Sequence, residues 1–179
     1  NNWDYFAGVD VRGKIIVMLV NDPDFDTGDD RGFGGRRMTY YGRWTYKFEE
    51  AARRGAAGVL LIHEDEAAAY PWPVVNSSWT GPQHDLARDN QGVDRARIEG
   101  WITNRVAREL FADAGLDFDR ERARAQNRGF RPVSLRARGS ITLETQLERH
   151  ASRNVIGVLR GRERPNEAVL YGAHWDHLG

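Results

Sequence analysis

Residues 45–63 have the sequence TYKFEEAARRGAAGVLLIH, which predicts a helix followed at once by a buried strand. Phe48 and Ala52 lie four residues apart and share one helical face, and Thr45 is suited to the N-cap position. Gly55 is expected to end the helix, because glycine readily adopts the left-handed conformation found at helix C-termini. The apolar run after Gly55 has the length and the unbroken hydrophobicity of a buried strand.

A second strand is predicted before this helix, at residues 11–20, where VRGKIIVMLV is rich in β-branched residues. A strand, a helix and a strand in this order favour a parallel pair joined by a right-handed crossover. Residues 98–102, IEGWI, predict one more strand, and residues 103–115 predict the helix that follows it. The fold class predicted from these segments is therefore α/β.

Two segments rich in turn-forming residues are predicted to be loops. Residues 21–35, NDPDFDTGDDRGFGG, lack the glycine and glutamate spacing of an EF-hand, so we expect a solvated surface loop rather than a calcium site. Residues 70–82, YPWPVVNSSWTGP, carry Trp72 and Trp79, which either stack on a ligand or a partner domain, or cover the edge of the sheet. His63 is followed by the acids EDE, which predict a solvated turn rather than a metal cluster.

The C-terminal third of the chain has several distinct patterns. Residues 117–128 predict a second helix, which is rich in arginine, has little apolar surface and is expected to face the solvent. Residues 130–147 alternate between apolar and polar, as a half-buried antiparallel strand does. Residues 154–161, NVIGVLRG, and residues 168–171, AVLY, predict two further strands.

The composition bears on the possible classes of function. The chain has 179 residues with 26 basic and 26 acidic side chains, so its net charge does not support binding to nucleic acid or to an acidic membrane. Cysteine is absent, which excludes disulfides, thiolate metal ligands and thiol catalysis. No apolar run reaches transmembrane length. Residues 1–3, NNW, are no signal peptide, so any export signal is expected to have been removed or to lie outside this chain.

Candidate metal ligands gather after the last predicted strand. His174 and Asp176 are two residues apart, so on an extended chain they point the same way, and Asp176 can accept the second ring N–H of His174. An imidazole just past the end of a strand is well placed to bind a metal, because the strand holds it rigidly. A metal site needs more ligands than these, so the chain is expected to be the front part of an enzyme.

Two parts of the chain resemble known families. Residues 11–17, 47–62 and 100–115 together resemble a protease-associated domain, a small α/β module found inserted in several exopeptidases. Residues 154–161 and 168–179 resemble the opening strands of a dizinc exopeptidase family, which includes bacterial leucyl aminopeptidases, glutamate carboxypeptidase and the transferrin receptor. The two resemblances cover nearly the whole chain, and their order is more specific than either motif alone.

The second resemblance implies roles for individual residues. In that family the histidine of the strand-end His-x-Asp motif binds one of two zinc ions, so His174 is the implied ligand and Asp176 is implied to orient it. The family's other ligands and its general base lie downstream of the residues present here, and His177 is assigned no chemistry. The implied function is removal of N-terminal residues from peptides by a zinc-activated water, and the chain by itself is expected to be inactive.

Three other interpretations stay open. The chain is a binding module without chemistry if the peptidase body is degenerate, as in the transferrin receptor. The residues from His174 to Gly179 also match the end of the His-x-His-x-Asp-His signature of metallo-β-lactamase-type hydrolases, although the first histidine of that signature is replaced by Gly172. In the third interpretation, His174 only caps the end of a sheet.

The predicted organisation has two parts. Residues 1–139 form the protease-associated domain, which is expected to act as a lid or as a recognition module for the peptide substrate or a partner. Residues 140–179 form the first strands of the catalytic α/β sheet and lack helices of their own. We therefore expect them to expose apolar surface and to associate with further copies or with the rest of the catalytic domain. The resemblance implies a periplasmic or extracellular location.

Overall fold

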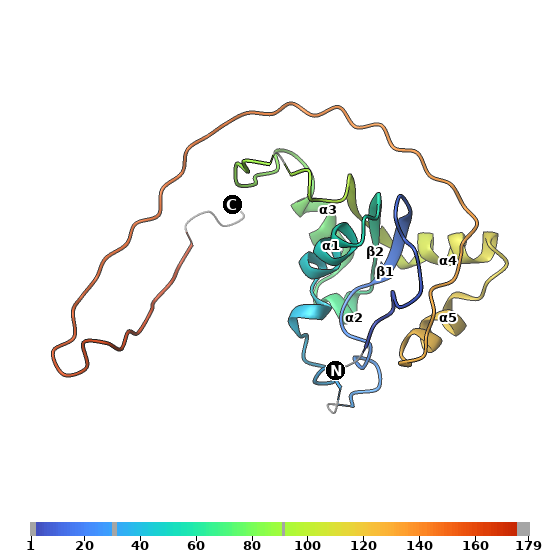
Figure 1. The fold of residues 1–179 in the computed structure, drawn as a ribbon, viewed down its shortest axis with the longest axis horizontal. Helices are drawn as coiled ribbons and strands as arrows, with labels where there is room; N and C mark the ends of the chain where they lie inside the picture. The colour runs from blue at the N-terminus through green and yellow to red at the C-terminus, as the bar shows by residue number, and fades with distance from the viewer. Residues whose placement is uncertain (1–2, 30–31, 91, 175–179) are drawn as a thin grey trace. The chain divides into compact units, whose positions relative to one another are not determined.

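The structure is a computed structural model that describes residues 3–29, 32–90 and 92–174. The chain divides into two compact units, Asn1–Ser140 and Ile141–Gly179. The first unit contains a three-stranded sheet in the order β1-β2-β3, and both pairs of strands are parallel. The strands are β1 (Ile15–Leu19), β2 (Gly58–His63) and β3 (Ile98–Thr103) (Figure 1). The predicted α/β class and the parallel pairing are confirmed.

Helices lie on both faces of the sheet (Figure 1). The helical segments, in chain order, are η1 (Tyr40–Gly42), α1 (Trp44–Arg53), α2 (Asp65–Ala68), α3 (Trp72–Ser78), α4 (Asn104–Asp113) and α5 (Phe118–Ala125). Alternate residues of a strand point to opposite faces, so β2 serves two layers. Val59 and Leu61 pack against α1 on one face, and Ile62 packs against Ala107 of α4 and Phe118 of α5 on the other.

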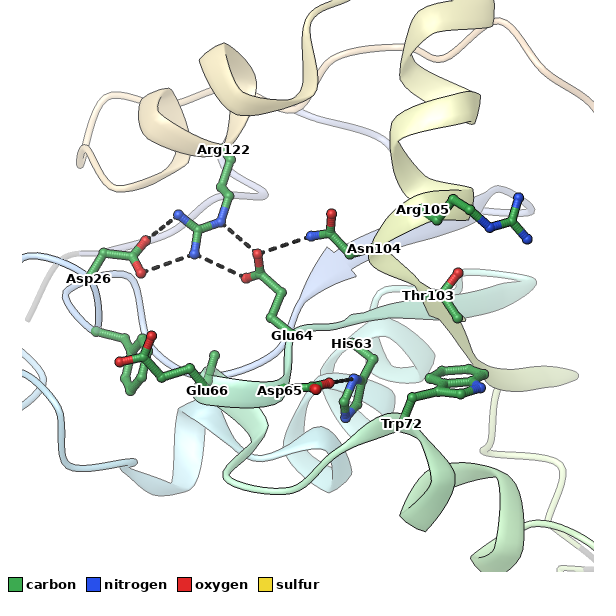
Figure 2. A pocket seen from close by; sticks show the side chains of 12 residues that line it. Asp26, His63, Glu64, Asp65, Glu66, Trp72, Thr103, Asn104, Arg105 and Arg122 are labelled. Carbon is green, nitrogen blue, oxygen red and sulfur yellow. Dashed lines mark hydrogen bonds and ion pairs between the residues drawn. The ribbon is translucent and has the colours of Figure 1, made fainter.

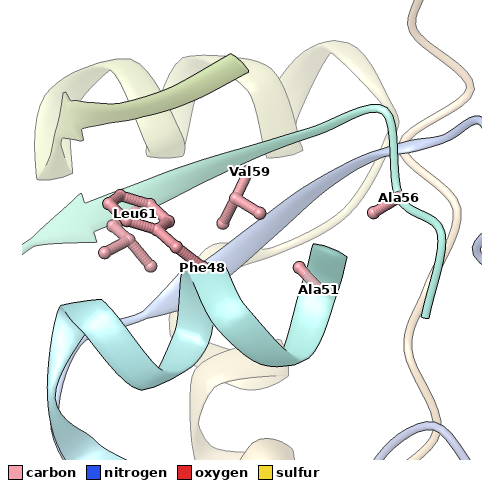
Figure 3. Packing of buried hydrophobic residues seen from close by; sticks show 5 residues of the cluster. All are labelled: Phe48, Ala51, Ala56, Val59 and Leu61. Carbon is pink, nitrogen blue, oxygen red and sulfur yellow. The ribbon is translucent and has the colours of Figure 1, made fainter. Parts of the chain in front are cut away.

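The most deeply buried cluster lies between α1 and the sheet (Figure 3). Phe48 and Ala51 of α1 face Val59 and Leu61 of β2, and Ala56 closes the cluster at the start of the strand. Val59 and Leu61 are completely shielded from solvent. Removing this apolar surface from water is the main stabilising contribution to the unit, at roughly 25 cal/mol per Å² buried.

The ends of the helices agree only in part with the capping residues predicted from the sequence. α4 begins as predicted, because the Thr103 side chain accepts a hydrogen bond from the Val106 N–H. The predicted N-cap at Thr45 is wrong: the N-cap residue is Arg43, two residues earlier, and it makes no side-chain hydrogen bond, so that α1 begins at Trp44. Gly55 follows the helix with a φ of +76°, as expected for a residue that ends a helix.

The prediction of a loop throughout residues 70–82 is wrong, because α3 occupies Trp72–Ser78. Proline is accepted in the first turn of a helix, where the N–H that it lacks would have no intrahelical partner. Val75 of α3 is buried, which provides the tertiary contact that a short helix needs. The arginine-rich second helix, α5, was predicted to face the solvent. This prediction is only partly right, because Phe118 of α5 is buried against α4.

The acidic segment after β1 is a loop, as predicted, but two of its acids are not solvated. Asp22 and Asp24 are both buried. Asp22 accepts hydrogen bonds from the backbone N–H and the hydroxyl of Thr39, at 2.6 and 2.9 Å, and Asp24 accepts one from the N–H of Phe33 at 2.6 Å. A Cβ at Gly42 would lie 2.7 Å from a carboxylate oxygen of Asp22. These carboxylates therefore accept hydrogen bonds from loop N–H groups that have no backbone acceptor, and in this way they hold the loop in its conformation.

Burial of the charged Lys47 side chain of α1 lowers the free energy of unfolding. This destabilisation disappears only at high pH, where the lysine is neutral. Lys47 is half-buried, and burial lowers its pKa from 10.5 to about 8, although the charge of Asp22 acts in the opposite direction. Burial also raises the pKa of Asp22, against the hydrogen bonds from Thr39. Because the pKa of Lys47 is lower in the folded state, the unfolded state holds the extra proton between about pH 8 and 10.5. The free energy of unfolding therefore rises with pH between about pH 8 and 10.5. Below about pH 8, Lys47 is charged in the folded state and destabilises it by the full amount.

We therefore expect Lys47→Met to increase the free energy of unfolding near pH 7 by about 1–2 kcal/mol. The gain should shrink near pH 10, because there the wild-type lysine is neutral in the folded protein. Urea denaturation at the two pH values measures both effects. Lys14→Met is the control, since Lys14 is the other lysine of the chain and is exposed. An equal effect of the two substitutions at both pH values would contradict the assignment.

The strands predicted in the C-terminal third are not formed. Residues 129–174 contain no helix or strand, so the predicted strands at 130–147, 154–161 and 168–171 are all absent from this part of the described chain. Their apolar side chains are exposed, with Val155 at 98%, Leu159 at 99% and Leu170 at 93% of full exposure. A strand needs a neighbour for its backbone hydrogen bonds, and alternating sequence alone does not supply one. Across the described residues no helix is long and apolar enough to span a membrane.

Candidate functional site

A pocket of about 470 Å³ lies at the C-terminal edge of the sheet (Figure 2). Each of the three strands contributes to it through the segment that follows the strand, and α5 closes one side. The lining residues are Phe25, Asp26, His63, Glu64, Asp65, Glu66, Ala67, Trp72, Thr103, Asn104, Arg105 and Arg122. Small-molecule sites in open parallel sheets lie at this edge, and their volumes are about 300–1,000 Å³.

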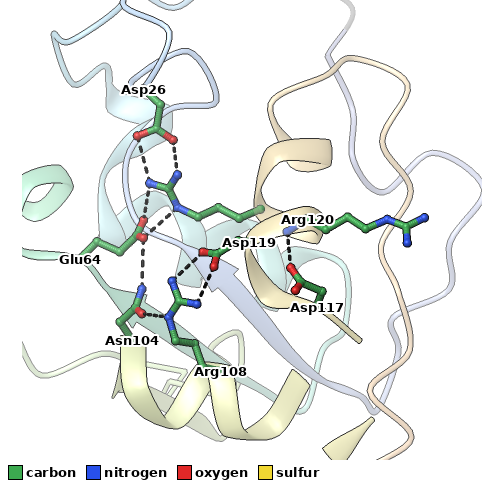
Figure 4. Close-up of polar contacts among 8 residues, drawn as sticks. Asp26, Glu64, Asn104, Arg108, Asp117, Asp119 and Arg120 are labelled. Atoms are coloured by element: carbon green, nitrogen blue, oxygen red, sulfur yellow. Dashed lines mark hydrogen bonds and ion pairs between the residues drawn. The ribbon is translucent and has the colours of Figure 1, made fainter. Parts of the chain in front are cut away.

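An ion-pair network forms one wall of the pocket (Figures 2 and 4). The guanidinium of Arg122 lies 2.8 Å from Glu64 and 2.6 Å from Asp26. Glu64 also accepts a hydrogen bond of 3.2 Å from the amide of Asn104. The network joins α5 to the loop after β1, to the residue after β2 and to the first residue of α4. These charges therefore satisfy one another and hold the wall in place.

A second salt bridge holds α5 against α4 (Figure 4). Arg108 forms a two-pronged pair with Asp119, with distances of 2.7 and 2.6 Å. Asp119 has a lowered pKa, chiefly because of the hydrogen bond from Arg108. Both side chains are about half exposed or more, so the pair contributes orientation more than stability.

His63 forms the deepest polar part of the pocket wall. The residue is only 3% exposed, and the rings of Tyr70, Trp72 and Trp101 surround its ring, with centroids 5.6–6.0 Å away. Its Nδ1 lies 3.2 Å from a carboxylate oxygen of Asp65. In the tautomer with the proton on Nδ1, which suits this contact, Nε2 is an acceptor. This buried Nε2 has no hydrogen-bond partner among the described residues.

The acids after His63 have structural explanations. Asp65 and Glu66 occupy the first turn of α2, where negative charge is favourable, and their side chains are 70% and 73% exposed. Glu64 is instead largely buried, because it faces Arg122 and Asn104. The expected exposure to solvent is thus confirmed for two of the three acids, but these two begin helix α2 and do not form a turn. In the described ranges, no group of three or more candidate ligands is arranged to hold a metal ion.

The two tryptophans of residues 70–82 have different surroundings. Trp72 lines the pocket and contacts His63 edge-on. Trp79 is 42% exposed, and its ring lies 5.8 Å from the ring of Trp44 in a T-shaped arrangement. Of the two alternatives, stacking on a ligand is open to Trp72, whereas Trp79 covers α1.

The predicted zinc ligand His174 lies in the Ile141–Gly179 unit and is exposed. Asp176 and His177 lie outside the described residues. The proposed hydrogen bond between His174 and Asp176 therefore stays a prediction. His63 is a site residue for which sequence reasoning gave no role, and its signal was a histidine at the end of an otherwise apolar strand.

Comparisons of the chain with protein-family models, with curated proteins and with solved structures find no match.

Proposed function

We propose that the chain is the protease-associated module and the beginning of the catalytic domain of a zinc-dependent aminopeptidase. The order of the motifs supports this proposal, because the module-like segments come first and the His-x-Asp segment follows. The three-stranded parallel sheet with helices on both faces is compatible with such a module. In the proposed enzyme this module recognises the peptide or covers the active site.

The observation that carries the proposal is the exposure of two strand-like apolar runs in the Ile141–Gly179 unit. Side chains of the first run, from Val155 to Leu159, are 81–99% exposed, and those of the second, Val169 to Tyr171, are 81–93% exposed. Runs of this kind are normally buried within a sheet that is covered on both faces. The proposal provides that environment, in which further strands and helices of the catalytic domain cover both runs.

In the proposed enzyme, two residues of this chain contribute to zinc binding. His174 would donate one ring nitrogen to the metal, and Asp176 would accept the other ring N–H and hold the ring in position. Among the described residues no group of three or more candidate ligands is arranged to hold a metal, so in the proposed enzyme the other ligands would come from the rest of the catalytic domain. When bound, zinc lowers the pKa of a water molecule and polarises the scissile carbonyl.

A comparison of two proteins tests the proposal. We expect the 179-residue chain to show no zinc-dependent hydrolysis of leucine p-nitroanilide above the blank, because one imidazole does not retain zinc. The protein encoded by the complete reading frame should hydrolyse the same substrate and lose activity with a chelator. Zinc-dependent turnover by the 179 residues would contradict the proposal. An inactive complete protein would favour a binding module without chemistry, a role that the pocket of the first unit also fits.

A further inference from the structure

We propose that the pocket at the C-terminal edge of the sheet binds a ligand through a primary ammonium group. The inference concerns the Asn1–Ser140 unit alone. It does not depend on the zinc chemistry proposed for His174, because no residue of the second unit lines the pocket.

Both cationic side chains that line the pocket, Arg105 and Arg122, are already in ion pairs. Both sides of the Arg122 guanidinium are paired, with Glu64 and with Asp26. The amide of Asn104 donates to Glu64, at 3.2 Å. Arg105 pairs with Glu109 of the next helical turn, at 2.6 Å, and its guanidinium extends away from the network (Figure 2). An anionic ligand would therefore have to displace existing ion pairs.

The acceptors of the same wall are in excess. Four carboxylates line the pocket against two guanidiniums. Asp65 uses one oxygen toward His63, and Glu66 uses one oxygen toward Arg36, so each has an oxygen left for a ligand within the described contacts. The contact of 3.2 Å with His63 Nδ1 places the exposed Asp65 carboxylate beside His63 at the pocket. A wall with unused acceptors and a negative balance selects a cation that carries N–H donors.

The aromatic part of the wall favours the same class of ligand. Trp72 lines the pocket beside His63, and an indole face attracts an ammonium group through its quadrupole. The buried Nε2 of His63 is a further acceptor, and a donor that reached it would remove the cost of leaving it unpaired. His63, Asp65 and Trp72 lie next to one another at the end of β2, so these three side chains form the part of the wall that an ammonium group would meet (Figure 2).

Ligand-observed NMR titration of the 179-residue chain without zinc tests the inference. Leucinamide carries a free α-ammonium and should bind, whereas N-acetyl-leucinamide, which is uncharged, should not. Nα-acetyl-lysinamide distinguishes a side-chain ammonium from an α-ammonium. Asp65→Asn should weaken binding of the charged probe about fivefold, because it removes one charge and keeps the shape of the side chain. Asp113→Asn is the matched control, since Asp113 is an exposed acid of α4 that does not line the pocket.

Three results would contradict binding through an ammonium group. Equal binding of leucinamide and its acetylated form would overturn the inference, as would equal effects of the two aspartate substitutions. Binding of inorganic phosphate in preference to leucinamide would also overturn it. If Asp65→Asn disturbs the circular dichroism spectrum, Glu66→Gln provides the same charge change at a side chain that is 73% exposed. Because zinc is absent throughout, failure here leaves the aminopeptidase proposal untouched, and the reverse holds for the hydrolysis assay.

Discussion

His174→Ala is expected to reduce the zinc-dependent hydrolysis of leucine p-nitroanilide by the complete protein at least about 100-fold. Loss of a residue that only orients a ligand costs about 10–100-fold in metal affinity or activity, and loss of the ligand itself should cost more. The fall should appear in kcat/KM together with a loss of bound zinc, because the proposed role of His174 is to hold the metal. Steady-state kinetics and elemental analysis of zinc per protein measure the two quantities.

His150→Ala is the matched control for this substitution. His150 is another exposed histidine of the Ile141–Gly179 unit, and it also has a nearby carboxylate, with Glu148 at 3.2 Å. We expect the control to retain both activity and zinc. Unchanged zinc content in the His174 variant, or equal losses in both variants, would mean that His174 is not a ligand.

Leu61→Ala should lower the free energy of unfolding by about 2–5 kcal/mol. Leu61 is completely buried in β2 and packs against Phe48 and Ala51 of α1. The substitution removes apolar surface from the core and leaves a cavity between the helix and the sheet, where neighbouring β-strands limit the collapse of the space. Because natural domains are stable by only about 5–15 kcal/mol, this is a large part of the total.

Leu86→Ala is the control, because it removes the same atoms from a leucine that is exposed. Leu86 is 84% exposed, so the same deletion should change stability by less than about 0.5 kcal/mol. Urea denaturation followed by circular dichroism measures both variants. A cost at Leu61 as small as that at Leu86 would show that β2 is not the centre of the core.

The strands of the sheet were predictable because their signal is local. The runs that became β1, β2 and β3 are short and mainly apolar. The central strand β2 is buried on both faces, and the edge strands β1 and β3 are partly buried. The helix after β3 was equally clear, since Thr103 caps it and an apolar stripe follows at helical spacing. In each case the interactions that decide the element lie within a few residues.

The errors concern segments whose structure depends on distant residues. Prolines and polar residues in 70–82 suggested a loop, yet burial of Val75 stabilises α3. The acids after β1 suggested a solvated surface, yet Asp22 finds its donors at Thr39, 17 residues away. The alternation in residues 130–147 suggested a strand, yet the described chain offers it no pairing partner. Composition predicts local preference, and it contains no information on which partner is within reach.

Local sequence was sufficient for the class of this protein, namely parallel strands joined by helices, because hydrophobic periodicity and helix-ending glycines act over short distances. The candidate pocket required the folded chain. Arg122 meets Glu64 across 58 residues and Asp26 across 96, and those pairings determine which carboxylates are neutralised and which remain for a ligand. Charges that lie far apart along the chain come within hydrogen-bond distance only after the sheet has brought the ends of its strands together, so the chemistry of the pocket is a property of the tertiary structure.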